Sequence, residues 1–223
     1  MSTGAGPTPL LSGSGVLLRG AFNPSIFQPA WFAREGLIPV EEADTATINI
    51  IHSQVASFET PSFRVQVTND TFEVAALGRP FTDLVRDLAY GAFSILHHTP
   101  MTALGMNNFH HFQARSEDTW HQLGHEFAPK DFWNPLLKSP GMQGITIRGQ
   151  REDDLVGWVD VRVEPSLFVL PNGVFVHVND HVQLTEGESA EGAQKLMQIL
   201  TETWSKASER AERIISAVGE KIT

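Results

Sequence analysis

The sequence contains nine histidines, a residue type that can bind a metal ion or transfer protons near neutral pH. Six of them form three pairs: His97-His98, His110-His111 and His121/His125. The third pair has the i, i+4 spacing with which two imidazoles bind one metal ion on a helix. Trp120, Leu123 and Phe127 mark the buried face of that helix, however, and the two histidines lie roughly 130–170° away from it. Adjacent histidines in a strand point to opposite faces, so we expect no metal site at any of the pairs.

Other motifs that would indicate catalysis or cofactor binding are missing from the sequence. It contains no glycine-rich dinucleotide or phosphate loop and no GxSxG nucleophile turn. It also contains no cysteine, which excludes disulfides, thiolate zinc sites and cysteine nucleophiles. We therefore expect no cofactor and favour a protein without catalytic activity.

The best candidate for a polar site is one face of a predicted sheet in the second half of the chain. Its ligand-binding side chains would be Arg148, Arg162, Glu164, His177 and His181. In the predicted register Glu164 lies directly opposite His181, where a carboxylate can orient an imidazole. Such a pair could perform general acid–base chemistry if it lined a cavity. The alternative is a solvated sheet face with alternating charges, which antiparallel sheets commonly present.

These side chains depend on two predicted hairpins for their common orientation. One hairpin has a two-residue turn at Asn172-Gly173, and the other has a three-residue turn at 152–154. The predicted pairs are Val163–Val182, Leu167–Val178 and Val169–Val176 in the first and Ile145–Val161 and Ile147–Val159 in the second. Both registers place the aliphatic side chains on one face and the polar set on the other.

The first half of the chain contains a similar hairpin and an amphipathic helix. A turn at Asn69-Asp70 would pair Val67 with Phe72 and place the apolar side chains of both strands on one face. Residues 80–96 have the 3.6-residue apolar period of a helix that covers a core. Further strands are predicted at 16–22, 45–52 and 101–112.

The last segment, 188–219, is predicted to form one long helix. Its apolar stripe follows spacings of four and three residues over almost four heptads. At about 1.5 Å per residue the helix is roughly 48 Å long, whereas strands of 6–10 residues offer only about 20–35 Å. We therefore expect its distal end to extend past the sheet and contribute to self-association, unless segment 127–137 of the same chain covers it. The interface residues would be Ala207, Ala211, Ile214, Ile215 and Val218.

Together these elements predict an α+β fold. A curved antiparallel sheet of seven or eight strands would carry the helices 80–96 and 188–219 on one face. The element order reads β-α-βββ-α twice, which is compatible with pseudo-repeats over 16–100 and 101–219 and equally with a chance echo. The layout is similar to TBP-like saddles and helix-grip folds, a likeness of topology that implies no function. Residues 1–15 are expected to form a flexible, glycine-rich arm before a single domain over 16–223.

Composition and charge limit the classes of partner. The chain has 16 Lys+Arg and 26 Asp+Glu, a net charge of −10, which disfavours nucleic acids and anionic membranes as partners. No apolar stretch approaches the length of a membrane span, and no secretory signal is recognisable, so we expect a cytoplasmic protein. We therefore predict a non-enzymatic partner-binding or assembly protein that forms a homo-oligomer. The alternative is a small-molecule-binding protein or enzyme with a pocket between the long helix and the sheet.

Overall fold

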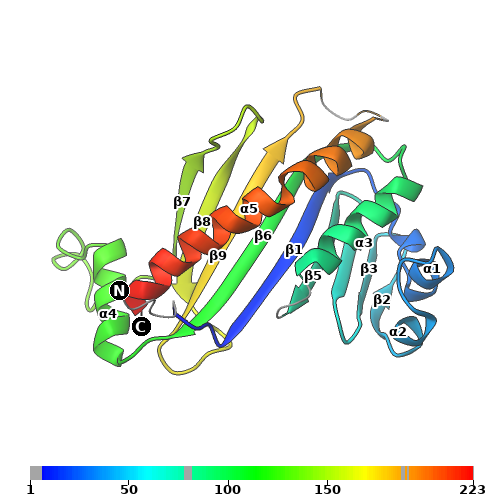
Figure 1. The fold of residues 1–223 in the computed structure, drawn as a ribbon. Coiled ribbons are helices and arrows are strands. Elements are labelled where there is room, and N and C mark those ends of the chain that lie inside the picture. Colours follow the sequence, from blue (N-terminus) through cyan, green and yellow to red (C-terminus); the bar gives the residue numbers. More distant parts are fainter. Residues whose placement is uncertain (1–6, 78–81, 187–188, 190, 223) are drawn as a thin grey trace, which may run out of the picture.

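The computed structural model describes residues 7–77, 82–186, 189 and 191–222 (Figure 1). Its strands are β1 (Leu11–Gly20), β2 (Thr47–Ile51), β3 (Val55–Glu59), β4 (Arg64–Thr68), β5 (Thr71–Leu77), β6 (Met101–Gln113), β7 (Ile145–Gln150), β8 (Gly157–Pro165) and β9 (Gly173–Gln183). Its helices are η1 (Pro24–Ile26, a 3-10 turn), α1 (Pro29–Arg34), α2 (Val40–Asp44), α3 (Thr82–Ile95), α4 (Glu117–Phe127) and α5 (Gly192–Ile222). The expectations for residues 1–6, 78–81, 188 and 190 lie outside the described residues.

The strands form one antiparallel sheet in the order β2-β3-β4-β5-β1-β6-β9-β8-β7. This arrangement confirms the predicted α+β class. β1 and β6 pair at the centre, and the other strands of each half of the chain follow outward on its own side. The described residues form nine strands rather than seven or eight, because the prediction missed β3, a short strand that buries Ala56 and Phe58. β1 begins at Leu11, so residues 11–15 belong to a strand and not to the predicted arm.

α3 and α5 lie on one face of the sheet, which we call the helix face (Figure 1). Below them are two hydrophobic cores. The first lies under α3 and the beginning of α5 and includes Phe72 and Trp204. The second lies under the end of α5 and includes Val176 and Ile215. The opposite face of the sheet, which we call the outer face, is not covered by α3 or α5.

Strand register agrees with the sequence prediction in the first half of the chain only. The observed pairs around Asn69-Asp70 are Val67–Phe72 and Val65–Val74, as predicted. The registers predicted for the second half are wrong. The observed pairs there are Val163–Val176, Val161–Val178, Ile147–Val161 and Ile145–Val163. Each of the two registers is shifted by an even number of residues, so the side chains of every strand remain on the predicted face of the sheet.

The larger register error comes from the loop that joins β8 to β9. Seven residues, 166–172, stand in place of the predicted two-residue turn. Ser166 closes this loop, because its Oγ accepts hydrogen bonds from the backbone N–H groups of Phe168 and Val169, at 3.1 and 2.9 Å. Pro165 and Pro171 have no N–H group to donate to a strand ladder, and β8 accordingly ends at Pro165.

The distal end of α5 is covered by the chain itself. Ala207, Ala211 and Ile215 are at most 2% exposed, and Leu123 of α4 belongs to the core that covers the last turns. The other two predicted interface residues, partly buried against the same core, are Ile214 and Val218. The apolar side chains at this helix end are therefore covered within the chain itself, so they no longer require a second subunit. The predicted interface through this helix stays a prediction.

Candidate functional site

The outer face of β7, β8 and β9 carries the five residues predicted as a ligand-binding set. They are Arg148, Arg162, Glu164, His177 and His181. The two long helices lie on the opposite face of the sheet (Figure 1). The strands bring the five side chains to one surface, but the contacts among them differ from the predicted ones.

Each charged side chain of this set is paired with an opposite charge on the same face. The guanidinium of Arg148 donates to both carboxylate oxygens of Asp160, at 2.8 Å each, and this hydrogen bonding lowers the pKa of the Asp160 carboxyl. Arg162 donates to Glu164 through Nε at 2.8 Å. These four groups therefore neutralise one another, and none of them is left as a free charge for an ionic ligand.

Trp158 lies between Arg148 on β7 and His181 on β9. The imidazole of His181 stacks on the indole, with ring centroids 4.1 Å apart and an interplanar angle of 22°. The guanidinium of Arg148 lies 4.2 Å from the indole centroid, and the indole N–H donates to Asp160 at 3.0 Å. These contacts hold Trp158 within the sheet surface, and the sequence prediction did not assign it a role.

The two histidines of the set are neutral near pH 7 and lack a carboxylate partner. The Nε2–H group of His177 donates to the side-chain oxygen of Asn107 at 3.0 Å, and burial lowers the pKa of His177 to about 4. Burial also lowers the pKa of His181, whose Nε2 is buried and has no hydrogen-bond partner among the described residues. Glu164 lies opposite Phe175 and not opposite His181. The predicted carboxylate–imidazole pair is therefore not formed.

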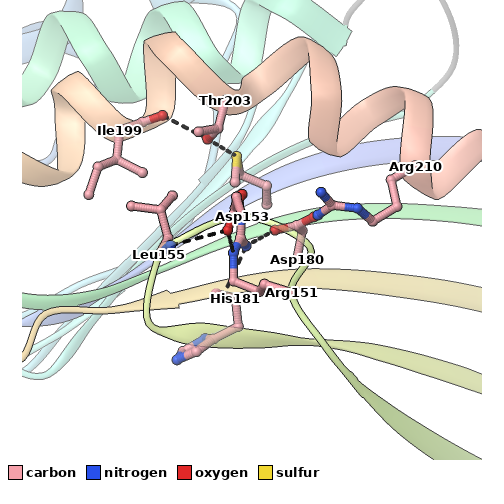
Figure 2. Close-up of polar contacts among 9 residues, drawn as sticks. Arg151, Asp153, Leu155, Asp180, His181, Ile199, Thr203 and Arg210 are labelled. Carbon is pink, nitrogen blue, oxygen red and sulfur yellow. Dashed lines mark hydrogen bonds and ion pairs between the residues drawn. The ribbon is translucent and has the colours of Figure 1, made fainter.

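Side chains fill the space between α5 and the sheet, and they include a buried ionic cluster (Figure 2). Asp180 of β9 is 1% exposed and accepts hydrogen bonds from Arg151 and Arg210. Arg151, from the β7–β8 connection, also donates to both carboxylate oxygens of Asp153 at 2.7 Å, which lowers the pKa of the Asp153 carboxyl. The cluster joins the sheet, this connection and α5. It occupies the region in which the alternative prediction placed a ligand pocket.

Two depressions of about 360 and 530 Å³ lie at the other side of the molecule, next to the end of α3. Both are lined by Ile26 and Leu96, and the smaller one also by His97 and His98. Neither is lined by a residue of the predicted ligand-binding set.

The loop between β8 and β9 exposes three large apolar side chains, which we call the apolar tip. They are Leu167, Phe168 and Leu170, with 84%, 76% and 74% of their surfaces exposed. The prediction missed this feature because it placed residue 167 in a strand. The signal in the sequence is three large apolar residues within four positions, enclosed by Pro165 and Pro171.

Hydrogen bonds hold the apolar tip in place. Ser166 Oγ accepts from two backbone N–H groups of the loop and also lies 2.8 Å from Nδ1 of His111 on β6. The side chain of Gln113 donates to the carbonyl of Pro171, and Val169 between the exposed residues is buried. The loop thus has a defined conformation although its largest side chains face solvent.

Further apolar surface adjoins the tip at the start of β1. The ring of Phe168 lies 5.4 Å from that of His111, whose backbone carbonyl accepts a hydrogen bond from Leu10. Leu10 and Leu11 are 61% and 41% exposed. Segments 7–18 and 165–176 contain no charged residue. The tip and the start of β1 therefore form an uncharged region on a chain whose net charge is −10.

No protein-family model matches this sequence, and no curated protein matches it either. In the part of the chain that the structure describes, no group of three or more His, Asp or Glu side chains is placed to hold a metal ion. No helix of the described residues is long and apolar enough to cross a membrane.

Proposed function

We propose that this protein binds another protein through the apolar tip. The observation that carries the proposal is the exposure of Leu167, Phe168 and Leu170 in a hydrogen-bonded loop. Together they expose on the order of 400 Å² of apolar surface, and a patch of that size on a monomer is often functional. Burial of such surface stabilises a complex by about 25 cal/mol per Å².

The tip also indicates the chemistry of its partner. Because segments 7–18 and 165–176 carry no charge, a matching surface is apolar and uncharged, with polar groups confined to its rim. The loop is ordered before it binds, so little conformational entropy is lost on association. A negatively charged membrane is a poorer match, because the chain is acidic and has no basic side chain in either segment.

Packing beneath α5 supports partner binding over the alternative of a small-molecule pocket or an active site. Trp204, Ala207 and Ala211 are at most 2% exposed against the sheet, and Asp180 is bound by two arginines. The charged residues of the predicted polar set, Arg148, Arg162 and Glu164, are bound in ion pairs on the outer face. A cytoplasmic location stays a prediction.

The strand order supports a second proposal, that the chain consists of two pseudo-repeats over 16–100 and 101–219. In each half the first strand lies at the centre of the sheet and the last strand lies next to it. The second strand of each half lies at the edge of the sheet. A long helix ends each half and lies on the helix face. The first half differs by one additional strand, and it has η1, α1 and α2 where the second half has α4. A TBP-like or helix-grip layout is part of the same proposal.

A photo-crosslinking residue at position 168 tests the proposed partner binding in native cells. We expect a discrete protein adduct at this position. The matched control is position 48 on β2, where Ile48 is 57% exposed but lies outside the tip, and no such adduct is expected there. The adduct at 168 should disappear when Leu167→Ser and Leu170→Ser are added.

Three outcomes would contradict the proposal. They are the absence of a protein adduct at 168, an adduct that survives the two serine substitutions, and adducts formed with lipids alone. Circular dichroism and thermal unfolding check that the substituted chains remain folded, which we expect because exposed side chains contribute little to stability.

A further inference from the structure

The two ends of the sheet differ in how they are protected. An edge strand presents unpaired backbone N–H and C=O groups that can pair with another chain, and natural edges are often interrupted by bulges or guarded by charges. At one end, the pairing of β2 with β3 is interrupted by an irregularity between Ile48 and Ile50. At the other end, β7 pairs with β8 without interruption from Ile145 to Gln150.

β7 itself carries no side chain that guards its free edge. Residues 146–150 are all exposed, and β7 contains neither proline nor lysine. Its one charged residue, Arg148, is drawn back over β8 by Asp160 and Trp158. Its guanidinium therefore does not protect the outward edge.

An apolar side chain is also left in solvent on this strand. Ile145 packs partly against the second core, but Ile147, two residues further on the same face, is 61% exposed. An exposed, regular and partly apolar edge strand is a template for strand addition.

We infer that β7 pairs antiparallel with β7 of a second copy of this chain, about a two-fold axis perpendicular to the sheet. A strand edge is self-complementary in this arrangement. With the axis at Ile147, the two Ile147 side chains meet on the helix face, and Arg148 lies opposite Thr146 of the second copy. No like charges face each other, so the net charge of −10 opposes this contact less than contacts elsewhere. This interface is separate from the apolar tip.

Sedimentation velocity over a range of concentrations tests this inference. A single strand pair buries a small area, so we expect a dimer that forms between about 1 and about 100 micromolar protein. Ile147→Lys should leave a folded monomer over this range. The matched control is Ile48→Lys, an exposed isoleucine on the other edge strand, which should dimerise like the wild type. Substitution of Leu167 and Leu170 by serine should also leave the dimer intact, which separates this test from that of the proposed function.

Hydrogen exchange of the wild-type protein gives a second measurement that needs no variant. The backbone amides of β7 should exchange more slowly at high than at low protein concentration, whereas those of β2 should not change. A wild-type monomer at every concentration, a dimer that survives Ile147→Lys, or β7 amides that are insensitive to concentration would each overturn the inference.

Discussion

Asp180 is a buried carboxylate that two arginines reach from different parts of the chain. It is 1% exposed, and the side chain of Arg151 is only 2% exposed. A buried ion pair contributes little net stability compared with apolar packing, but removal of one partner leaves an uncompensated charge in a low-dielectric environment. Asp180 is therefore important because its removal would leave buried arginine charge uncompensated, and not because its ion pairs add much net stability.

We therefore predict that Asp180→Ala lowers the free energy of unfolding by about 3–5 kcal/mol. The control is Glu73→Gln, which removes the partly exposed pair of Arg64 and Glu73 and should cost less than about 1 kcal/mol. Urea denaturation monitored by circular dichroism measures both. Similar effects of the two substitutions would contradict the assigned role of Asp180.

His177 is a second residue whose burial has a measurable consequence. Its pKa is lowered from 6.5 to about 4, chiefly by burial. Between these two pH values the unfolded chain binds a proton that the folded protein does not bind. The free energy of unfolding should therefore fall by about 3 kcal/mol as the pH is lowered from about 7.5 to about 4, and this contribution is constant above about pH 7.5.

Replacement of this imidazole gives the corresponding test. His177→Gln should reduce the pH dependence of stability in this window, as measured by urea denaturation at a series of pH values. A profile with the same slope as that of the wild type would show that His177 does not cause the dependence. His111 and His181, whose pKa values are also lowered by burial, should account for part of the remaining slope.

At the scale of elements, α5 has the role of a packing helix that contributes to both cores. Its apolar stripe is buried as the heptad spacing predicts, and it packs against the sheet of the same chain. Near its end, α4 and β6 supply the surface that covers it. Ile215 and Ile214 are adjacent, yet Ile215 is fully buried and Ile214 only partly.

This difference predicts unequal effects of the two isoleucines. Ile215→Ala should lower the free energy of unfolding by about 2–5 kcal/mol, the range for a buried isoleucine, and Ile214→Ala by less than half as much. Neither substitution should change the oligomeric state in sedimentation experiments. If Ile214→Ala abolished self-association without loss of stability, the result would support the helix interface predicted from the sequence.

At the scale of the whole molecule, two hydrophobic cores share one sheet and one long helix. β6 and β9 supply side chains to both cores, and α5 runs across both. The ionic cluster around Asp180 lies where α5 passes from one core to the other (Figure 2). Because the same elements build both cores, loss of packing in one core should weaken the other.

We therefore expect one cooperative unfolding transition. Tryptophan residues report on the two cores separately, with Trp31 and Trp204 in the first and Trp120 against the second. In fluorine NMR of protein labelled with fluorotryptophan, the folded-state signals of these three tryptophans should disappear at the same urea concentration. An earlier loss of the Trp120 signal would instead indicate that the second core unfolds independently.

Much of this fold could be predicted from the sequence because the side-chain period of a strand or helix depends on backbone geometry alone. Alternation along β4, β7, β8 and β9 assigned their side chains to the correct face, including all five residues of the polar set. The 3.6-residue period located α3 and the buried stripe of α5. These properties are local, so short stretches of sequence were sufficient.

Tertiary structure decided which residues meet. The register of β8 and β9 depends on a loop closed by Ser166, whose contact with His111 spans 55 positions of the chain. That contact exposes the apolar tip and separates Glu164 from His181. The cover over the end of α5 likewise comes from α4, a distant segment. Such contacts form only when distant elements pack together, and no local period of the sequence encodes them.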